Sequence, residues 1–336
     1  MTGTDNFPPL GGARDVRGEK FLCGLNRILP LGRKYHPLLR ALNGRRGLLA
    51  TPFDRYRLLQ PAAWSKAVTS QLLSGVEIAP EFEVIKPICR RLTGGVLVDV
   101  GANIGAFTLL LRSVSSLPVI AYEPQPFLFK LLQWNIGFNK LTGVDARNVA
   151  CGSGRGEVAF SVGINGSIVC ESAKAKKKLS SAGSAALNLE QEAEMTQSGD
   201  AVVNVPVTTL DEDLADVPSV ALLKIDCEGF EYDVLQGAAG LVKRHRPQLV
   251  LEVHPTQLEN FGHSTEKVLD LVARDYELEF WYFQIGRHAS KLSRSLAKFR
   301  RPKAHRCADA AEMLAAAKST PGPAQIYFIG KPREKQ

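Results

Sequence analysis

The chain has 336 residues, 45% of them hydrophobic, which is enough for one α/β domain with additions but short of two full domains. Its net charge of +8 comes from dispersed basic residues without interleaved aromatics, so a nucleic-acid partner is not favoured. The six cysteines lack C-x-x-C spacing, which disfavours a zinc site or a disulfide framework and is typical of a reducing compartment.

The first quarter of the chain is predicted to be mostly helical. Residues 1–20 are rich in glycine, proline and charge, and we expect them to be flexible. Helices are expected between residues 21 and 90, at 21–28, 36–43, 64–73 and 81–92. Such an extension would form a helical cap over the ligand cleft. No apolar run has the length of a membrane span or a signal peptide, so we expect a cytoplasmic protein.

Strand and helix patterns alternate from residue 91 onward, which indicates an α/β fold with a largely parallel sheet. Strands are expected at 96–100, 118–122, 144–149, 157–162, 203–210, 220–226, 248–253, 277–283 and 325–329. Helices are expected at 105–114, 127–139, 231–241 and 265–274. The last two strands would close the sheet as an antiparallel pair. Residues 163–202 have little periodicity, and we expect a long insertion or lid within a domain spanning 91–336.

The most specific motif is Val98-Asp99-Val100-Gly101-Ala102-Asn103-Ile104-Gly105, with Glu123 at the end of the next predicted strand. A strand that runs through a glycine turn into a helix is typical of a nucleotide-binding βαβ unit. Asn103 replaces the middle glycine of the dinucleotide fingerprint and would crowd a pyrophosphate. Asp99 suits the ammonium and sulfonium of S-adenosylmethionine, and Glu123 suits the ribose diol. The pattern favours this cofactor over NAD; the alternative is a turn without a ligand.

A second motif spans residues 222–231. Asp226 follows a predicted strand at its carboxyl end, where open α/β sheets bind their ligands. Lys224 lies on the same face of that strand and is expected to pair with Asp226. Glu231 falls in the first turn of the next helix, where it would complement the helix dipole.

The next strand brings Glu252 and His254 to the same edge of the sheet. We predict that His254, with Asp226 and Glu228, orients and deprotonates an acceptor hydroxyl, since an unperturbed imidazole titrates near neutrality. The alternative is a histidine with a structural role. These side chains could also hold a divalent metal, but nothing in their spacing requires one, and no metal is predicted.

With both motifs in place, the chain resembles the FkbM family of S-adenosylmethionine-dependent methyltransferases. The resemblance covers residues 75–255. It is carried by the glycine motif with Thr108, Tyr122-Glu123-Pro124 with Asn135 and Asn139, Asn148-Val149-Ala150, Thr209-Leu210-Asp211, residues 224–231 and Glu252-Val253-His254-Pro255. It implies a Rossmann-like, seven-stranded class I methyltransferase sheet, mostly parallel, with the N-terminal helices as a cap.

The resemblance also implies roles for residues of the cofactor site. The methionine end of S-adenosylmethionine would be held by Asp99, Gly101, Asn103 and Gly105, the ribose by Glu123, and the adenine by the stretch with Asn148 and Ala150. Members of the family are similar to O-methyltransferases of natural products, glycans and glycolipids. We therefore expect a small-molecule or glycan acceptor. The alternatives are an RNA or protein methyltransferase and a non-catalytic binding module, and the oligomeric state is left open.

Overall fold

The computed structural model describes residues 13–28, 35–74, 81–163, 177–178, 188–199, 201–284, 304–319 and 324–334. Its centre is an eight-stranded sheet with the order β14-β13-β15-β12-β11-β4-β5-β6. The strands are β4 (Val96–Val100), β5 (Val119–Tyr122), β6 (Val144–Arg147), β11 (Val220–Ile225), β12 (Gln248–Val253), β13 (Tyr276–Gln284), β14 (Ala304–Cys307) and β15 (Ala324–Pro332).

Five of these strands, β12, β11, β4, β5 and β6, pair in parallel with one another, and the other three join the sheet through antiparallel pairs. The neighbours from β12 to β6 all pair in parallel. β15 pairs antiparallel with both β12 and β13, which confirms the expected antiparallel closure of the sheet. The seven strands predicted at the positions of β4, β5, β6, β11, β12, β13 and β15 are therefore present. The sheet has one strand more than the seven expected. Its eighth member, β14, adds to the edge at β13.

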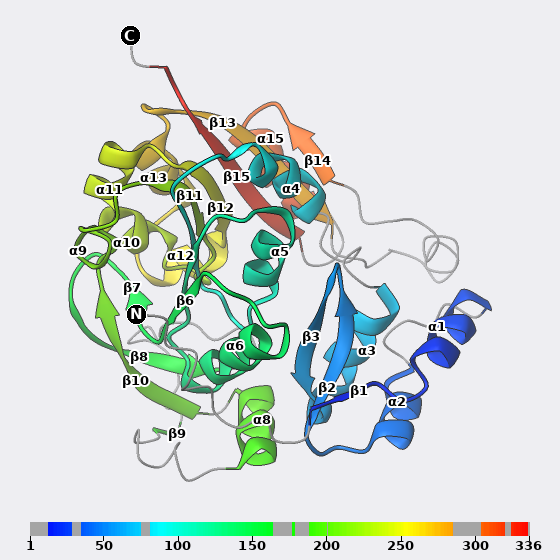
Figure 1. Cartoon of the computed structure of the whole chain (residues 1–336). Helices are drawn as coiled ribbons and strands as arrows, with labels where there is room; N and C mark the ends of the chain where they lie inside the picture. The colour runs from blue at the N-terminus through cyan, green and yellow to red at the C-terminus, as the bar shows by residue number, and fades with distance from the viewer. Residues whose placement is uncertain are drawn as a thin grey trace.

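Helices cover both faces of the sheet, whereas the first three helices lie beside the separate sheet of β1 (Arg14–Asp15), β2 (Leu48–Phe53) and β3 (Tyr56–Pro61) (Figure 1). The helices of the described residues are α1 (Glu19–Ile28), α2 (His36–Asn43), α3 (Ser65–Ser74), α4 (Glu81–Arg91), α5 (Ala106–Val114), α6 (Pro126–Phe138), α8 (Leu189–Ser198), α9 (Leu210–Asp213), α10 (Glu231–Gln236), α11 (Ala239–His245), α12 (Pro255–Asn260), α13 (Thr265–Val272), α15 (Ala310–Ser319) and a 3₁₀ turn, η2 (Ala62–Trp64). None of the helices in the described part of the chain is long and apolar enough to cross a membrane.

Successive side chains of the central strands pack into two different hydrophobic cores, one on each face of the sheet. Along β4, Val98 and Val100 belong to the core beneath α10 to α13, whereas Leu97 belongs to the core beneath α4 to α6. Leu222 and Leu223 of β11 separate in the same way. Successive side chains of a strand point to opposite faces, so a strand buried on both sides is apolar almost throughout.

The predicted helix 231–241 is wrong in its length. It divides into α10 and α11, which are separated by Gly237 and Ala238. A Cβ atom on Gly237 would lie 1.9 Å from the carbonyl oxygen of Gly152. The chain turns here because another loop passes against its backbone, a contact that helical periodicity does not reveal.

The expectation of a mostly helical stretch from 21 to 90 is also corrected. α1 to α4 lie close to the predicted helices, but residues 48–61 form a β-hairpin of β2 (Leu48–Phe53) and β3 (Tyr56–Pro61). Asp54 takes a left-handed conformation in the two-residue turn, with φ of 51°. β1 (Arg14–Asp15) extends this sheet within the stretch expected to be flexible, of which residues 1–12 lie outside the described residues.

The 163–202 insertion lies partly within the described residues. α8 begins with a capping box at Asn188, and its buried Ala193 carbonyl accepts a hydrogen bond from Trp64 Nε1 at 2.8 Å. Glu192 pairs with Lys130 of α6 at 2.7 Å. A small second sheet joins β7 (Ala150–Cys151), β8 (Gly156–Val162), β9 (Lys177–Lys178) and β10 (Ala201–Thr208).

Candidate active site

The glycine motif forms the turn between β4 and α5. Gly101 and Gly105 have φ of 77° and 92°, which L side chains rarely adopt. A Cβ atom on Gly101 would lie 1.9 Å from the carbonyl oxygen of Asp226. The ends of β4 and β11 are therefore in backbone contact. Asn103 is also left-handed, with φ of 53°, and lines a cavity at this edge.

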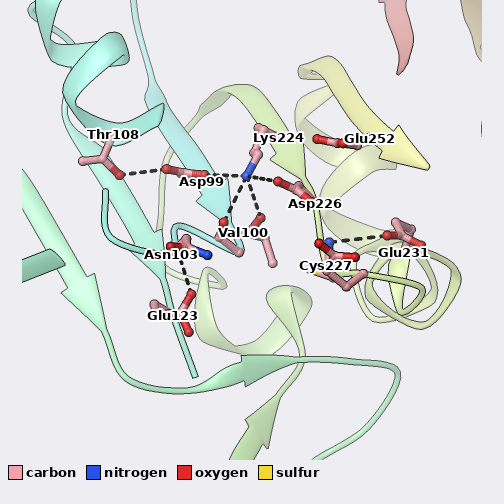
Figure 2. Close-up of polar contacts among 12 residues, drawn as sticks. Asp99, Val100, Asn103, Thr108, Glu123, Lys224, Asp226, Cys227, Glu231 and Glu252 are labelled. Atoms are coloured by element: carbon pink, nitrogen blue, oxygen red, sulfur yellow. Dashed lines mark hydrogen bonds and ion pairs between the residues drawn. The ribbon is translucent and has the colours of Figure 1, made fainter. Parts of the chain in front are cut away.

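Glu123 follows β5, as predicted, and its carboxylate faces the glycine turn. It accepts the backbone N–H of Asn103 at 2.8 Å (Figure 2). It also accepts the backbone N–H of Gln125 at 2.8 Å. Burial raises the pKa of Glu123 to about 7, although both N–H groups favour the charged form. The side chain thus lies at the cavity wall in a fixed orientation.

Asn148 and Ala150 lie beyond Glu123. Asn148 is exposed and is not among the residues that line the cavity; its Nδ2 donates to the carbonyls of Glu123 at 2.8 Å and Pro124 at 2.9 Å. It therefore fixes the loop that carries Glu123. Val149 and Ala150 do line the cavity.

Asp99 is placed beneath the turn. It is fully buried, accepts a hydrogen bond from Thr108 Oγ1 at 2.7 Å and pairs with Lys224 Nζ at 3.2 Å. Asp99 and Lys224 are register partners on β4 and β11. Figure 2 shows Lys224 between Asp99 and Asp226, to which it pairs at 3.3 Å, as the sequence predicted.

Lys224 also binds the turn itself. Its Nζ donates to the carbonyl of Gly101 at 3.1 Å and to that of Val100 at 3.4 Å. Burial alone would lower the pKa of Lys224, but Asp226 and Asp99 outweigh burial and raise it. The charged lysine therefore connects the buried Asp99 to the backbone of the glycine turn.

One cavity of about 600 Å³ joins the two sequence motifs. Gly101, Asn103, Glu123 and Ala150 line it together with Asp226, Glu228, Glu252 and His254. The cavity lies at the carboxyl edge of the parallel strands, where the topology places ligands. The structure thus brings together the predicted catalytic residues and most of the predicted cofactor residues.

His254 follows β12 and is oriented by Glu231. Its Nδ1 lies 2.8 Å from Glu231 Oε1, and Glu231 is fully buried. Glu231 Oε1 also accepts the backbone N–H of Gly229 at 2.9 Å. Burial opposes the imidazolium, but Glu231, Asp226 and Glu252 outweigh burial and raise the pKa of His254 to about 10. The near-neutral titration expected from the sequence is therefore replaced by a ring that is charged at neutral pH.

The structure places the glycine turn beside a histidine–carboxylate cluster. Comparisons with known proteins identify the family to which this arrangement belongs. Residues 99–278, more than half of the chain, match the methyltransferase FkbM domain. The chain belongs to the FkbM methyltransferase family.

Two named methyltransferases are similar to parts of this chain. Over 151 residues the chain is 32% identical to Methyltransferase 1 of Beauveria bassiana (strain ARSEF 2860). This match covers 42% of this chain and 57% of that protein. The solved FkbM methyltransferase from Methylobacillus flagellatus KT is similar over 79% of this chain and 54% of its own, with 16% identity and a TM-score of 0.35. The chain thus spans little more than half the length of either relative.

A SAM-dependent O-methyltransferase from Thermotoga maritima is a further solved structure similar to this chain. The two have 12% identity and a TM-score of 0.35, over 77% of this chain and 67% of the other.

Part of the cavity wall lies outside the FkbM match. Leu58 and Gln60 of β3, Gln71 of α3 and Gln325 of β15 all line the cavity. The hairpin within the stretch that was expected to be mostly helical is therefore part of the site. No sequence signal identified these residues, since they lie far from both motifs along the chain.

Two asparagines of the family motif hold this hairpin in place. Asn135 and Asn139 lie one turn apart on α6, and each side-chain amide pairs with both backbone groups of one β3 residue. Asn135 pairs with Leu59, at 2.7 and 3.1 Å, and Asn139 pairs with Arg57, at 2.8 Å for both bonds. Asn135 Nδ2 also donates to the carbonyl of Ile104 in the cofactor turn at 2.9 Å. Their i, i+4 spacing is the signal that points to a shared helical face.

Three further residues of the cluster were missed or assigned a smaller role from sequence. Glu231 was predicted to complement a helix dipole, whereas it orients His254. Tyr327 of β15 donates its hydroxyl to Glu252, its register partner on β12. Burial, followed by the charge of Asp226, raises the pKa of Glu252 to about 8. Glu81 opens α4, and burial raises its pKa to about 7 near Asp226 and Lys224.

Proposed function

We propose that this protein is an S-adenosylmethionine-dependent O-methyltransferase whose acceptor is a hydroxyl of a small molecule, a sugar or a glycan-containing metabolite. The observation that supports it most is one cavity of about 600 Å³ that the glycine turn, Glu123 and His254 all line. Cavities of this size bind whole cofactors and drug-sized ligands. Cofactor and acceptor would therefore meet in one site.

The residues near the glycine turn fit S-adenosylmethionine. Gly101 brings bare backbone to the cavity, as close approach to a ligand requires. Glu123 already accepts two N–H groups, and a carboxylate has about four acceptor positions, so it can also accept the ribose hydroxyls. Ala150 would contact the adenine, and Asn148 would act through the Glu123 loop. Asp99 would act through Lys224 rather than by touching the methionine end.

When bound, the cofactor would supply an electrophilic methyl group on a sulfonium. The residues of this chain would hold the acceptor oxygen in line with that group and remove its proton. Asp226 and Glu228 line the cavity and would accept the O–H of the acceptor, while His254, fixed by Glu231, would orient it. In-line positioning and the loss of one proton are sufficient for this reaction.

A transfer assay tests this proposal. The purified chain is incubated with S-adenosylmethionine labelled in the methyl group and with glycosides, polyols and phenols, and the labelled products are treated with mild base. We expect label in base-stable methyl ethers. Glu123→Gln should lower incorporation at low cofactor concentration, and Asp233→Asn, outside the cavity, should not.

Label confined to base-labile esters, to protein or to RNA would contradict the proposed acceptor class while keeping a methyltransferase. Absence of transfer to every class by a folded sample would contradict the enzymatic proposal.

A further inference from the structure

The imidazole of His254 is held in the orientation that metal-binding histidines adopt. Its Nδ1 is hydrogen-bonded to the buried Glu231 at 2.8 Å, so its Nε2 points into the cavity. Histidines that bind metals through one ring nitrogen almost always bond a carboxylate or carbonyl through the other. Nε2 has no hydrogen bond within the described residues, since its nearest carboxylate oxygens lie at 3.6 Å or more.

Three carboxylates from separate positions surround that nitrogen. Nε2 lies 3.6 Å from Glu228 Oε2, 3.7 Å from Glu252 Oε1 and 3.9 Å from Asp226 Oδ1. The ligand atoms of Asp226, Glu228 and His254 all lie within 4.8 Å of one another. Ligand atoms around one divalent cation stand about 3 to 4.5 Å apart, given bonds of about 2.0 to 2.4 Å. The three atoms are therefore close to the spacing that a cation needs.

Glu252 is an independent pointer to a ligand at this place. Its side chain is 7% exposed, and its Oε2 accepts the Tyr327 hydroxyl. Its Oε1 accepts no hydrogen bond within the described residues and faces His254 Nε2. Glu252 also lines the cavity, and a carboxylate in a largely buried side chain is stabilised when a cation or a proton meets its free oxygen there. Asp226, Glu228 and His254 are between 14% and 29% exposed, so an ion can reach them from the cavity.

The charges of the cluster are also unbalanced. Four carboxylates, those of Asp99, Asp226, Glu228 and Glu231, face two cationic side chains, Lys224 and His254. Like charges this close repel and need a compensating partner. A divalent cation supplies that compensation at the point where the carboxylates converge.

We propose that Asp226, Glu228 and His254 Nε2 bind a divalent cation of the Mn²⁺ or Zn²⁺ type, with Glu231 and Gln257 as the residues that position its ligands. Carboxylate oxygens and one imidazole form a mixed donor set that such ions accept. Gln257 Nε2 donates to Glu228 Oε2 at 3.3 Å, and Glu231 fixes the ring of His254. This assigns a metal to residues whose spacing in sequence did not require one.

The role of the cation rests on the proposed function. A divalent cation beside the acceptor lowers the pKa of a hydroxyl in contact with it. The hydroxyl proton leaves to solvent, and the oxygen forms a bond to the methyl carbon. The bond from that carbon to sulfur breaks, sulfur keeps the electron pair, and the products are a methyl ether and S-adenosylhomocysteine.

A Mn²⁺ titration of the full chain tests the site. The protein is treated with a chelator and dialysed, and free Mn²⁺ is then measured by electron paramagnetic resonance, with and without S-adenosylhomocysteine. We expect one ion per chain. Asp226→Asn, Glu228→Gln and His254→Gln should each weaken it at least about tenfold, and Glu231→Gln about ten- to hundredfold, because positioning residues have effects of that size.

The control is Asp233→Asn, which removes a carboxylate 3.2 Å from His263 in a second carboxylate–histidine pair outside the cavity. It should bind Mn²⁺ like the wild type. S-adenosylhomocysteine affinity is measured calorimetrically on every sample. A chain that binds S-adenosylhomocysteine but neither Mn²⁺ nor Zn²⁺ overturns the metal site and leaves the methyltransferase proposal intact. Metal binding without any S-adenosylhomocysteine binding overturns the proposed function and keeps the metal site.

Discussion

Two parts of the cavity wall are built in different ways. The part assigned to the cofactor comes mostly from one continuous stretch, in which β4, the glycine turn, α5 and β5 follow one another and bring Asn103 to Glu123. The rest of the wall collects Gln60, His254 and Gln325 from elements that are distant in sequence. A local unit can be identified from its own residues, whereas an assembled wall exists only after folding. The four predictions below test this division.

The largest effect is expected at His254. His254→Ala should lower the rate of methyl transfer by about 10²-fold, the effect of misplacing a reacting group, because His254 orients the acceptor. The affinity for S-adenosylhomocysteine should be unchanged, because His254 pairs with Glu231 and the carboxylates around it and with none of the residues assigned to the cofactor. Turnover is measured at saturating cofactor and the affinity by calorimetry. An unchanged rate would remove His254 from the mechanism.

The next effect is expected in the glycine turn. Gly101→Ala places a Cβ atom 1.9 Å from the Asp226 carbonyl at a positive φ, so the backbone must shift. We expect the free energy of unfolding to fall by at least about 2 kcal/mol, since a left-handed non-glycine residue alone costs about 1 to 2 kcal/mol. Cofactor affinity should fall as well. Chemical denaturation and calorimetry measure the two quantities.

Gly24→Ala is the matched control for Gly101→Ala. Gly24 lies within α1, and a Cβ atom there would meet nothing within 4 Å. Its replacement should stabilise the chain by about 0.5 to 1 kcal/mol, the helix preference of alanine over glycine. Equal destabilisation by both substitutions would show that the close contact at Gly101 is not the cause.

A pH effect of intermediate size is expected from Glu123. Its pKa of about 7 means that the carboxylate is protonated below neutrality, where it loses acceptor capacity for the ribose diol. Affinity for S-adenosylhomocysteine should therefore fall about tenfold from pH 8 to pH 6. The same raised pKa stabilises the fold below about pH 4.5, and this contribution is lost as the pH rises through about 7.

Glu123→Gln provides the control for this pH effect, because its amide does not titrate. Calorimetry across the pH range should show a flat affinity for the variant at a weaker value. A slope equal to that of the wild type would assign the titration to another group.

The smallest effects are expected from the two asparagines that hold the hairpin, and they should differ from each other. Asn139→Ala frees the backbone of Arg57 and the carbonyl of Asn135 but no group of the cofactor turn, and should raise the acceptor KM severalfold with little change in cofactor affinity. Asn135→Ala also frees the carbonyl of Ile104, and should weaken both ligands. Each should lower the free energy of unfolding by about 1 to 3 kcal/mol, the cost of unpaired backbone groups. Identical effects of both variants on the two ligands would contradict this division.

Most of the central sheet was predictable because its signals are local. β4, β11 and β12 are apolar runs that end in functional residues, and the periodicity of α5 and α6 lies within single segments. The pairing of Lys224 with Asp226 followed from strand alternation alone. Glu123 was identified because the spacing from the glycine motif is set by one helix.

The remaining features depend on contacts between distant segments. The hairpin at 48–61 carries few of the alternating signals of a half-buried strand, because β2 is buried almost throughout, between β1 and β3 in its sheet and against α3. The break at Gly237 is set by Gly152, and the role of Glu231 is set by His254. Asp99 was assigned a ligand contact from sequence. In the structure it is paired with Lys224, its register partner on β11, beneath the turn.

The most direct test of the account is the calorimetric titration of S-adenosylhomocysteine into three samples, the wild type, Glu123→Gln and His254→Ala. We predict one site of micromolar affinity in the wild type, at least about tenfold weaker binding in Glu123→Gln, since a hydrogen bond to a charged group contributes about 1.5 to 3 kcal/mol, and unchanged binding in His254→Ala. A folded wild-type chain that binds no S-adenosylhomocysteine, or variants whose effects are reversed, would contradict it.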